Sequence, residues 1–158
     1  MPTVTLYWRI KEGYLELVKA FLEDLILSGF GKRKSVGYGT VESFDLHEYS
    51  GFTAVDEANG FVTLSRFVPA ETDPIKGFWN TTVKYGRLGD EFSLGNPFKR
   101  PLVQIETGAC FYDPTPRDWY GQLIAGLSPR EEVKHYGFAF TLPIHLPDLA
   151  PERVTLED

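Results

Sequence analysis

The sequence has little cysteine, no long hydrophobic run and no recognisable leader, and each shortage excludes a class of protein. Cys110 is the single cysteine, which excludes an internal disulfide framework and a cysteine-based zinc site. No run of about 18 apolar residues occurs, so we expect no transmembrane helix. The N-terminus, MPTVTLYWRI, lacks the basic-then-apolar order of a signal peptide, and a cytoplasmic protein is expected.

Positive charge is also scarce over the chain as a whole. The 158 residues carry 16 Lys and Arg against 22 Asp and Glu, a formal net charge of −6. The broad positive field that supports non-specific nucleic-acid binding is therefore absent, although a local basic site remains compatible with this charge. The chain is rich instead in glycine (15), proline (11) and aromatic residues (15%), which favours loops and strands in a globular protein.

Hydrophobic periodicity predicts an α+β fold. Lys11–Ser28 has apolar residues at helical spacing, so the pattern predicts a helix with one apolar stripe, and Gly29 follows where a left-handed cap favours glycine. The segments rich in β-branched and aromatic residues predict strands at Thr3–Ile10, Tyr38–Tyr49, Phe61–Val68, Thr81–Leu88, Leu102–Tyr112 and Val133–Leu146. The segments 69–80 and 113–127 are expected to be irregular, and the segment 147–158 is expected to be a polar tail.

The last predicted strand has the clearest alternation. Its even-numbered residues, from Tyr136 to Leu146, are apolar, so we expect them to form one buried face. Pro143 lies on the opposite face and indicates a sheet edge, because proline cannot donate to a ladder. The predicted helix is expected to pack on a sheet that contains this strand and Thr3–Ile10.

Residues Ser28–Gly39, SGFGKRKSVGYG, concentrate glycine and positive charge in one loop. The loop fails the Walker pattern, because Arg33 stands where Ser or Thr is required, and the dinucleotide pattern, because Lys34 replaces the third glycine. Glycines allow close approach of a ligand, basic side chains match phosphates, and the ring of Tyr38 offers a stacking surface for a base. A helix cap followed by a solvated basic turn explains the same residues without a ligand.

Four stretches together resemble a known family. GFGKRKSVGYGTVE is similar to the glycine-rich loop of CRISPR-associated RAMP proteins, and KYGRLG, KRPLVQIETGACF and VKHYGFAFTLPI follow in the order seen in subunit four of the type III-A Csm effector complex, a Cas5-like RAMP. Thr107 and Ala109 depart from the Glu-Gly-Ser order of the third stretch. The resemblance runs from Thr3 to about Leu146 and corresponds to the C-terminal half of such a subunit, without its first ferredoxin-like domain; a fragment, a split gene product and a shortened relative all remain open.

The resemblance implies a single ferredoxin-like (RRM-like) RAMP domain over residues 1–146 and a non-catalytic RNA-binding role. Such a subunit holds the 5′ tag of the crRNA and contacts the large Cas10-type subunit and the backbone RAMP subunits of the complex. The residues that the resemblance assigns to RNA binding are Gly29, Gly31, Lys32, Arg33, Lys34, Ser35, Gly37, Tyr38 and Gly39, with Arg87, Lys99 and Arg100 as further candidates.

The remaining chemistry-bearing residues agree with a protein that has no catalytic site, metal or cofactor. His47, His135 and His145 are scattered, and none has a second ligand at i+3 or i+4. The carboxylate pairs Asp90-Glu91 and Glu131-Glu132 are typical of solvated faces. Two other functions remain open: a structural domain whose loop binds protein, and a RAMP ribonuclease that processes precursor RNA. Some RAMP relatives use a histidine near the N-terminus for this cleavage, whereas the first histidine here, His47, lies beyond the loop. Separately, His135 beside Tyr136 is compatible with a general base and its partner.

Overall fold

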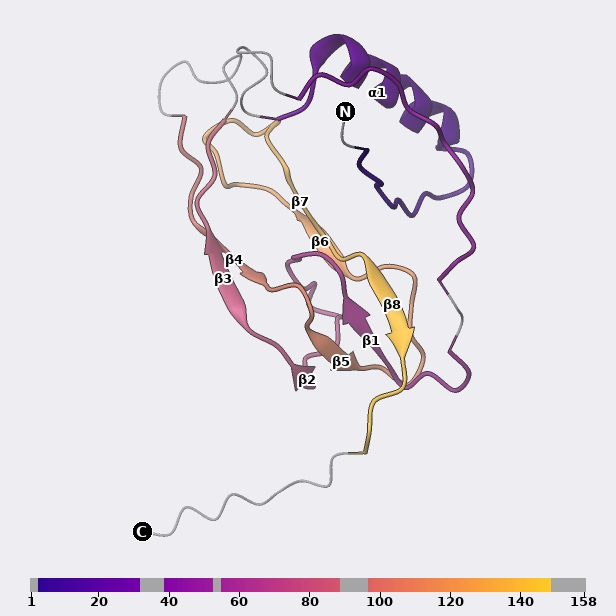
Figure 1. Ribbon diagram of the computed structural model, residues 1–158. Coiled ribbons are helices and arrows are strands. Elements are labelled where there is room, and N and C mark those ends of the chain that lie inside the picture. The colour runs from indigo at the N-terminus through magenta and orange to yellow at the C-terminus, as the bar shows by residue number, and fades with distance from the viewer. Residues whose placement is uncertain (1–2, 32–38, 53–54, 89–96, 149–158) are drawn as a thin grey trace. The chain divides into compact units, whose positions relative to one another are not determined.

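The computed structural model of the protein describes residues 3–31, 39–52, 55–88 and 97–148 (Figure 1). This part of the chain contains one helix and eight strands whose pairings are antiparallel, so the predicted α+β class is confirmed. Contacts divide the chain into two compact units, Met1–Gly51 and Phe52–Asp158. Within the described ranges, no helix combines the length and the apolar character needed to cross a membrane.

The helix of the first unit, α1, spans Leu15–Ser28. It begins later than the predicted Lys11 because Gly13 has a φ of +87°, which no α-helical residue adopts. The amide of Tyr14 instead closes a turn by donating to the carbonyl oxygen of Lys11 at 3.2 Å. At the other end, Gly29 has a φ of 71° and a ψ of 169°, so the expected positive φ is confirmed, but the residue lies outside the left-handed helical region.

Two predicted strands of the first unit are wrong. Thr3–Ile10 and the described part of Tyr38–Tyr49 contain no strand residue. Both segments make ring contacts instead of ladder pairs. The ring centroids of Tyr7 and Tyr49 are 4.9 Å apart, and those of Trp8 and Phe21, on α1, are 6.3 Å apart. Strand propensity reflects packing against a neighbouring strand, and these aromatic residues pack on rings instead.

The apolar stripe of α1 is only partly covered. None of its residues is buried, and Val18, Leu22, Leu25 and Ile26 are half-buried. Leu17 and Leu27, which are also apolar residues of α1, are 64% and 88% exposed. The half-buried residues recur at helical spacing, so the predicted apolar stripe is confirmed.

The second unit holds all eight strands. The first four are β1 (Gly60–Thr63), β2 (Gly77–Phe78), β3 (Thr81–Lys84) and β4 (Leu102–Ile105). The others are β5 (Cys110–Tyr112), β6 (Gly121–Ile124), β7 (His135–Phe138) and β8 (Thr141–Ile144). They form a four-stranded sheet in the order β2-β5-β1-β8 and two separate pairs, β3-β4 and β6-β7 (Figure 1).

Aromatic rings fill the core of this unit. The ring of Phe61, from β1, stacks on Tyr120 at 3.8 Å and on Phe111, from β5, at 5.3 Å between centroids. Phe67 meets Phe111 edge-on at 5.9 Å. Each of these four side chains is at most 1% exposed. Aromatic pairs in such geometries add stabilisation beyond the area that they bury, so this cluster fixes the inner face of the four-stranded sheet.

Two long predicted strands are each divided in two. Leu102–Tyr112 becomes β4 and β5, because a turn at Thr107 and Gly108 interrupts it and Gly108 has a φ of +89°. Gly108 donates its N–H to the carbonyl oxygen of Thr63, and Thr63 donates back to that of Ala109. At this turn the chain thus leaves its pairing with β3 and forms backbone hydrogen bonds with Thr63 of β1.

Val133–Leu146 becomes β7 and β8, which belong to different sheets. The predicted burial face is wrong over residues 136–141, where the odd-numbered Gly137, Ala139 and Thr141 are buried and Tyr136 is 66% exposed. At the other end of the predicted strand, the even-numbered Leu146 is buried, as predicted. Small side chains are required on this face, because a Cβ at Gly137 would overlap Ile124 and the backbone of Gln122. Alternation in the sequence therefore identified strand residues, but it assigned the inner face correctly only near Leu146.

The two strands that we did not predict, β2 and β6, depend on partners distant in sequence. β6 begins at Gly121, whose N–H donates to the carboxylate of Asp73 at 2.6 Å. The same buried carboxylate accepts from the amide of Ala70 at 2.9 Å and from the guanidinium of Arg117 at 3.0 Å. One side chain thus ties the 70–73 segment, predicted to be irregular, to the start of a strand.

The shorter predictions agree better with the structure. β1 lies at the start of the predicted Phe61–Val68, and β3 lies within Thr81–Leu88. β8, which contains Pro143, is at one edge of the four-stranded sheet, so the predicted edge position is confirmed. The ferredoxin-like arrangement and the single domain over residues 1–146 stay predictions, and residues 149–158 of the predicted tail lie outside the described residues.

Candidate nucleic-acid interface

A two-stranded ribbon in the second unit carries a group of basic side chains. β3 and β4 pair over their whole length, with Lys84 opposite Leu102. The pairing continues beyond the strands, where Lys99 donates its N–H to the carbonyl oxygen of Gly86 at 2.9 Å and Arg87 forms a bridge with Phe98. We call this structure, residues 81–88 and 97–105, the basic ribbon.

Four cations lie on the basic ribbon. Lys84, Arg87 and Arg100 are exposed, and Lys99 is half-buried. Among the described residues, no carboxylate forms a salt bridge with any of the four. Cations that are not neutralised locally keep their attraction for an external anion such as a phosphate.

Gly86 and two exposed aromatic residues also belong to the basic ribbon. The side chain of Lys99 lies against Gly86, where a Cβ would stand 3.2 Å from the Lys99 Cδ atom. Tyr85 is 80% exposed, and Phe98 is 65% exposed. An exposed ring beside a cation is the combination that single-stranded nucleic-acid sites use, because the ring stacks on a base while the cation contacts the backbone.

His135 connects β7 to the basic ribbon. Its Nε2 atom lies 3.3 Å from the Nε2 atom of Gln104, a buried residue of β4. Burial of the imidazole, followed by the nearby charges of Lys84 and Lys99, lowers the pKa of His135 below its ordinary value. The shift favours the neutral imidazole, so the charge of the ribbon comes mainly from its lysines and arginines.

The glycine-rich loop belongs to the first unit, and its base is described. Phe30 donates its N–H to the carbonyl oxygen of Gly39 at 2.8 Å, which brings the two ends of the loop together. Gly39 has a φ of +76°, and a Cβ there would overlap the carbonyl oxygen of Phe30. Gly31 has a φ of +95° with open space around it. Both positions therefore require glycine, one for contact and φ, the other for φ alone.

The residues predicted to bind RNA are divided between the two units. Arg87, Lys99 and Arg100 lie on the basic ribbon, whereas Gly29, Gly31 and Gly39 lie at the loop base. The other predicted residues lie outside the described residues; they are Lys32, Arg33, Lys34, Ser35, Gly37 and Tyr38. Their role in RNA binding stays a prediction.

Sequence reasoning did not include Lys84, Tyr85, Phe98 or Gln104 among the candidate residues. Lys84 and Tyr85 belong to the KYGRLG stretch beside Arg87, so the local run of basic and aromatic residues was the available signal. Gln104 and His135 carry no such signal, because they meet only through the packing of β7 beside β4.

The other histidines are not part of this interface. The Nδ1 atom of His145 lies 3.2 Å from the carbonyl oxygen of Glu57, and His47 is exposed in the first unit. No group of three or more metal-ligating side chains occurs within residues 3–31, 39–52, 55–88 and 97–148. The described part of the chain thus offers one histidine beside clustered cations, and that histidine is His135.

A scan against models of protein families finds no match to this chain, and a search of curated proteins finds no significant relative.

Proposed function

We propose that this chain is a non-catalytic protein that binds single-stranded RNA through the basic ribbon and the glycine-rich loop. The observation that carries the proposal is the basic ribbon itself: four cations without a salt-bridge partner in the described structure, beside two exposed rings. In a chain with a net charge of −6, such a concentration attracts a polyanion locally and leaves the rest of the surface repulsive.

Each part of the site has a distinct role in this proposal. The exposed cations Lys84, Arg87 and Arg100 contact phosphates, and Tyr85 provides a ring on which a base stacks. Base stacking and phosphate contacts tolerate many sequences, so specificity comes from the glycine-rich loop or from neighbouring subunits.

The resemblance to the Cas5-like RAMP group supplies the biological setting of the proposal. In that setting the chain adopts a ferredoxin-like arrangement, holds the 5′ tag of a crRNA and contacts the Cas10-type and backbone subunits of a type III effector complex in the cytoplasm. The support is the order of four sequence stretches, two of which, KYGRLG and KRPLVQIETGACF, include parts of the basic ribbon. No cofactor is part of the proposal.

The salt dependence of RNA binding tests the role of the basic ribbon. Replacing Arg87 and Arg100 together by Ala should lower the log–log salt slope by about 1.4, at roughly 0.7 per phosphate contact with a single strand. The matched control replaces Arg66 and Lys76, which are exposed elsewhere in the same unit, and removes the same charge. Binding of the full chain to a labelled single-stranded RNA over a salt series gives both slopes.

The result would contradict the proposal if the two double variants lowered the slope equally, since the effect would then depend on net charge. A wild-type chain that binds no RNA alone or in a reconstituted complex with crRNA would favour the structural partner domain instead.

One observation favours a second candidate, metal-independent RNA cleavage. Burial, followed by the nearby charges of Lys84 and Lys99, lowers the pKa of His135, which favours the neutral imidazole that a general base requires. In such a reaction the imidazole accepts the proton of a 2′-hydroxyl, whose oxygen attacks the adjacent phosphorus. The bond from phosphorus to the 5′-oxygen breaks, the 5′-oxygen takes a proton from water, and a 2′,3′-cyclic phosphate forms. A lysine ammonium stabilises the negative charge that develops on the phosphoryl oxygens.

Incubation with labelled RNA in the presence of a chelator separates the two candidates. We expect no cleavage by the wild-type chain. Cleavage that disappears in His135→Ala but persists in His145→Ala would establish the enzyme and overturn the non-catalytic role.

A further inference from the structure

The strand β3 forms one edge of the basic ribbon. Within the described structure β3 pairs with β4 alone, so its other side faces away from the ladder (Figure 1). The amide of Glu106 donates to the carbonyl oxygen of Asn80, and the amide of Lys99 donates to that of Gly86, both at 2.9 Å. The even-numbered residues of this segment thus point their backbone groups toward β4. Because the direction alternates along a strand, the odd-numbered residues point theirs outward.

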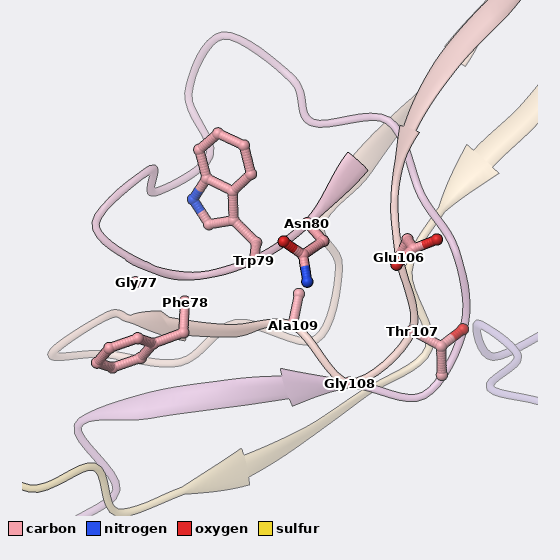
Figure 2. A pocket seen from close by; sticks show the side chains of 8 residues that line it. All are labelled: Gly77, Phe78, Trp79, Asn80, Glu106, Thr107, Gly108 and Ala109. Atoms are coloured by element: carbon pink, nitrogen blue, oxygen red, sulfur yellow. The ribbon is translucent and has the colours of Figure 1, made fainter. Parts of the chain in front are cut away.

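Four residues present these outward N–H and C=O groups, and we name them the β3 edge. They are Thr81, Val83, Tyr85 and Arg87. In the described ranges, no hydrogen bond to the backbone groups of these four residues occurs. The ladder ends at the Asn80–Glu106 pair, and Figure 2 shows both residues beside a pocket of about 540 Å³, on the connections from β2 to β3 and from β4 to β5. Unpaired backbone groups along an edge are a template for a further strand.

The composition of the β3 edge differs from that of the edge at β8. β8 contains Pro143, which lacks an N–H, whereas the segment 81–87 contains no proline. It contains β-branched and aromatic residues, which favour strand pairing, and Val83 is 46% exposed and Tyr85 is 80% exposed. Lys84, whose side chain lies on the opposite face, is also exposed. A strand added here would therefore contact exposed side chains on both faces.

The charge at the β3 edge selects between possible partners. Lys84 and Arg87 are exposed, and among the described residues neither forms a salt bridge with a carboxylate. Opposite charges directly across two strands stabilise the pairing, and like charges destabilise it. An antiparallel pair of two β3 edges centred on Lys84 would place two ammonium groups opposite each other, which disfavours a second copy of this chain. A segment with acidic residues at those positions is favoured.

We propose that the β3 edge binds an extended, acidic segment of a partner protein as an additional antiparallel strand. Main-chain hydrogen bonds hold the segment, and acidic side chains opposite Lys84 and Arg87 select it. The strand pairs of the described structure are antiparallel, which sets the expected direction. RNA fits the edge less well, because its phosphates only accept hydrogen bonds and leave the outward carbonyl groups without donors. This site does not depend on RNA binding by the ribbon, although both ligands would use Lys84 and Arg87 and would therefore compete.

The peptide acetyl-Glu-Thr-Val-Glu-Val-Thr-Thr-amide tests the main-chain pairing. In antiparallel register its glutamates lie opposite Arg87 and Lys84, and its valines lie opposite Tyr85 and Val83. Titration into the full chain should shift the backbone amide NMR signal of Tyr85. N-methylation of both valines removes two donors to the β3 edge and should weaken binding about tenfold. The matched control carries the two methyl groups on amides that face away, those of the glutamate between the valines and of the threonine before them. It should bind as the unmodified peptide does.

Substitutions at Val83 test the same pairing from the side of the protein. Val83→Pro removes one outward N–H and leaves the hydrogen bonds to β4 in place, so it should weaken peptide binding about threefold to tenfold. Val83→Thr keeps the N–H and a branched side chain, and should bind within about twofold of the wild type. Hydrogen exchange of the Thr82 and Lys84 amides, which point toward β4, checks that the ribbon is intact in both variants. Replacing both glutamates of the peptide by lysine should weaken binding about tenfold.

Four results would contradict the proposal. Equal binding of the two N-methylated peptides, unchanged binding in Val83→Pro, or an unmodified peptide that leaves the Tyr85 signal in place would overturn strand addition. Equal affinity of the glutamate and lysine peptides would overturn the acidic partner. Dimerisation of the full chain that Val83→Pro abolishes, without peptide binding, would assign the edge to a second copy. A shift of the Tyr85 signal by oligouridylate but not by the peptide would assign the edge to RNA.

Discussion

The two compact units solve the problem of burying apolar side chains in opposite ways. The second unit places four aromatic side chains of its own, at most 1% exposed, in one cluster between strands. The first unit contains the longest regular element of the described structure, α1, and none of its residues is buried. The apolar side chains of the strands are thus covered by other residues of their own unit, whereas those of α1 are covered only in part.

This difference shows that the buried aromatic core belongs to the second unit, although both units also expose large apolar side chains. Packing within the second unit accounts for its fold, because each strand finds a partner and the inner face is filled. Helical stability in proteins comes mainly from tertiary packing of an apolar face, which α1 has only in part. We therefore expect mutations of equal size to have very different effects in the two units.

The largest difference should come from removing a phenylalanine in each unit. Phe111→Ala should lower the free energy of unfolding by about 3–5 kcal/mol, because the ring is buried against Phe61 and Phe67. Phe21→Ala, whose ring is 53% exposed on α1, should cost less than about 1 kcal/mol. Chemical denaturation of the full chain measures both values, and equal losses would show that the first unit has a core of its own.

A smaller loss should follow from removing the carboxylate that ties β6 to the 70–73 segment. Asp73→Ala leaves the amides of Ala70 and Gly121 without their acceptor and should cost about 2–3 kcal/mol. The control, Glu71→Ala, removes an exposed carboxylate and should change stability by at most about 0.5 kcal/mol. If Asp73→Ala has as little effect as the control, the network contributes no net stability.

The base of the glycine-rich loop should show a local effect in the first unit. Gly39→Ala adds a Cβ that overlaps the carbonyl oxygen of Phe30 and occupies a positive φ, so the loop closure should weaken by about 1–2 kcal/mol. Hydrogen exchange of the Phe30 amide, which donates to Gly39, reports this opening. In Gly31→Ala, where space is open, exchange should rise less, and a greater rise there would contradict the loop geometry.

The smallest effect should be a pH dependence from His135. Its folded-state pKa lies below the unfolded value, so the unfolded chain takes up the proton first as pH falls. Stability should therefore decrease as pH falls from the ordinary histidine pKa through the lowered one, and should be constant in this respect at higher pH. His135→Gln should lack this component, and the difference between the two pH–stability curves isolates it.

Local patterns were sufficient for some elements. The helical spacing in Val18, Leu22 and Leu25 correctly located the body of α1, and the β-branched residues of TTVK located β3. What no local pattern contains is the partner. Leu102–Tyr112 looks continuous, and only the backbone bonds between Thr63 and the Gly108 turn divide it. Thr3–Ile10 has strand propensity but makes ring contacts instead of ladder pairs. Propensity alone does not distinguish these two kinds of packing.

The candidate site divides in the same way. Arg87, Lys99 and Arg100 were named as candidates by the family resemblance, and they do lie on one ribbon. His135 reaches that ribbon through its approach to Gln104, a contact between residues far apart in the sequence. Positions set by long-range register are the ones that the sequence leaves undetermined.

The edge strand with Pro143 has a consequence for self-association. Thr63, at the end of β1, donates its N–H to the carbonyl oxygen of Ala109, on the side of β5. The next residue, Leu64, donates its N–H to the carbonyl oxygen of Phe140, on the side of β8, so successive N–H groups point alternately to the two neighbours. Pro143 of β8 is opposite Phe61 of β1, whose backbone N–H points toward β5. The two residues are therefore not hydrogen-bonded to each other, and the nitrogen of Pro143 faces away from β1, toward the free edge. A strand from another copy would find no donor there, so this edge resists the templated growth of intermolecular sheets and fibrils.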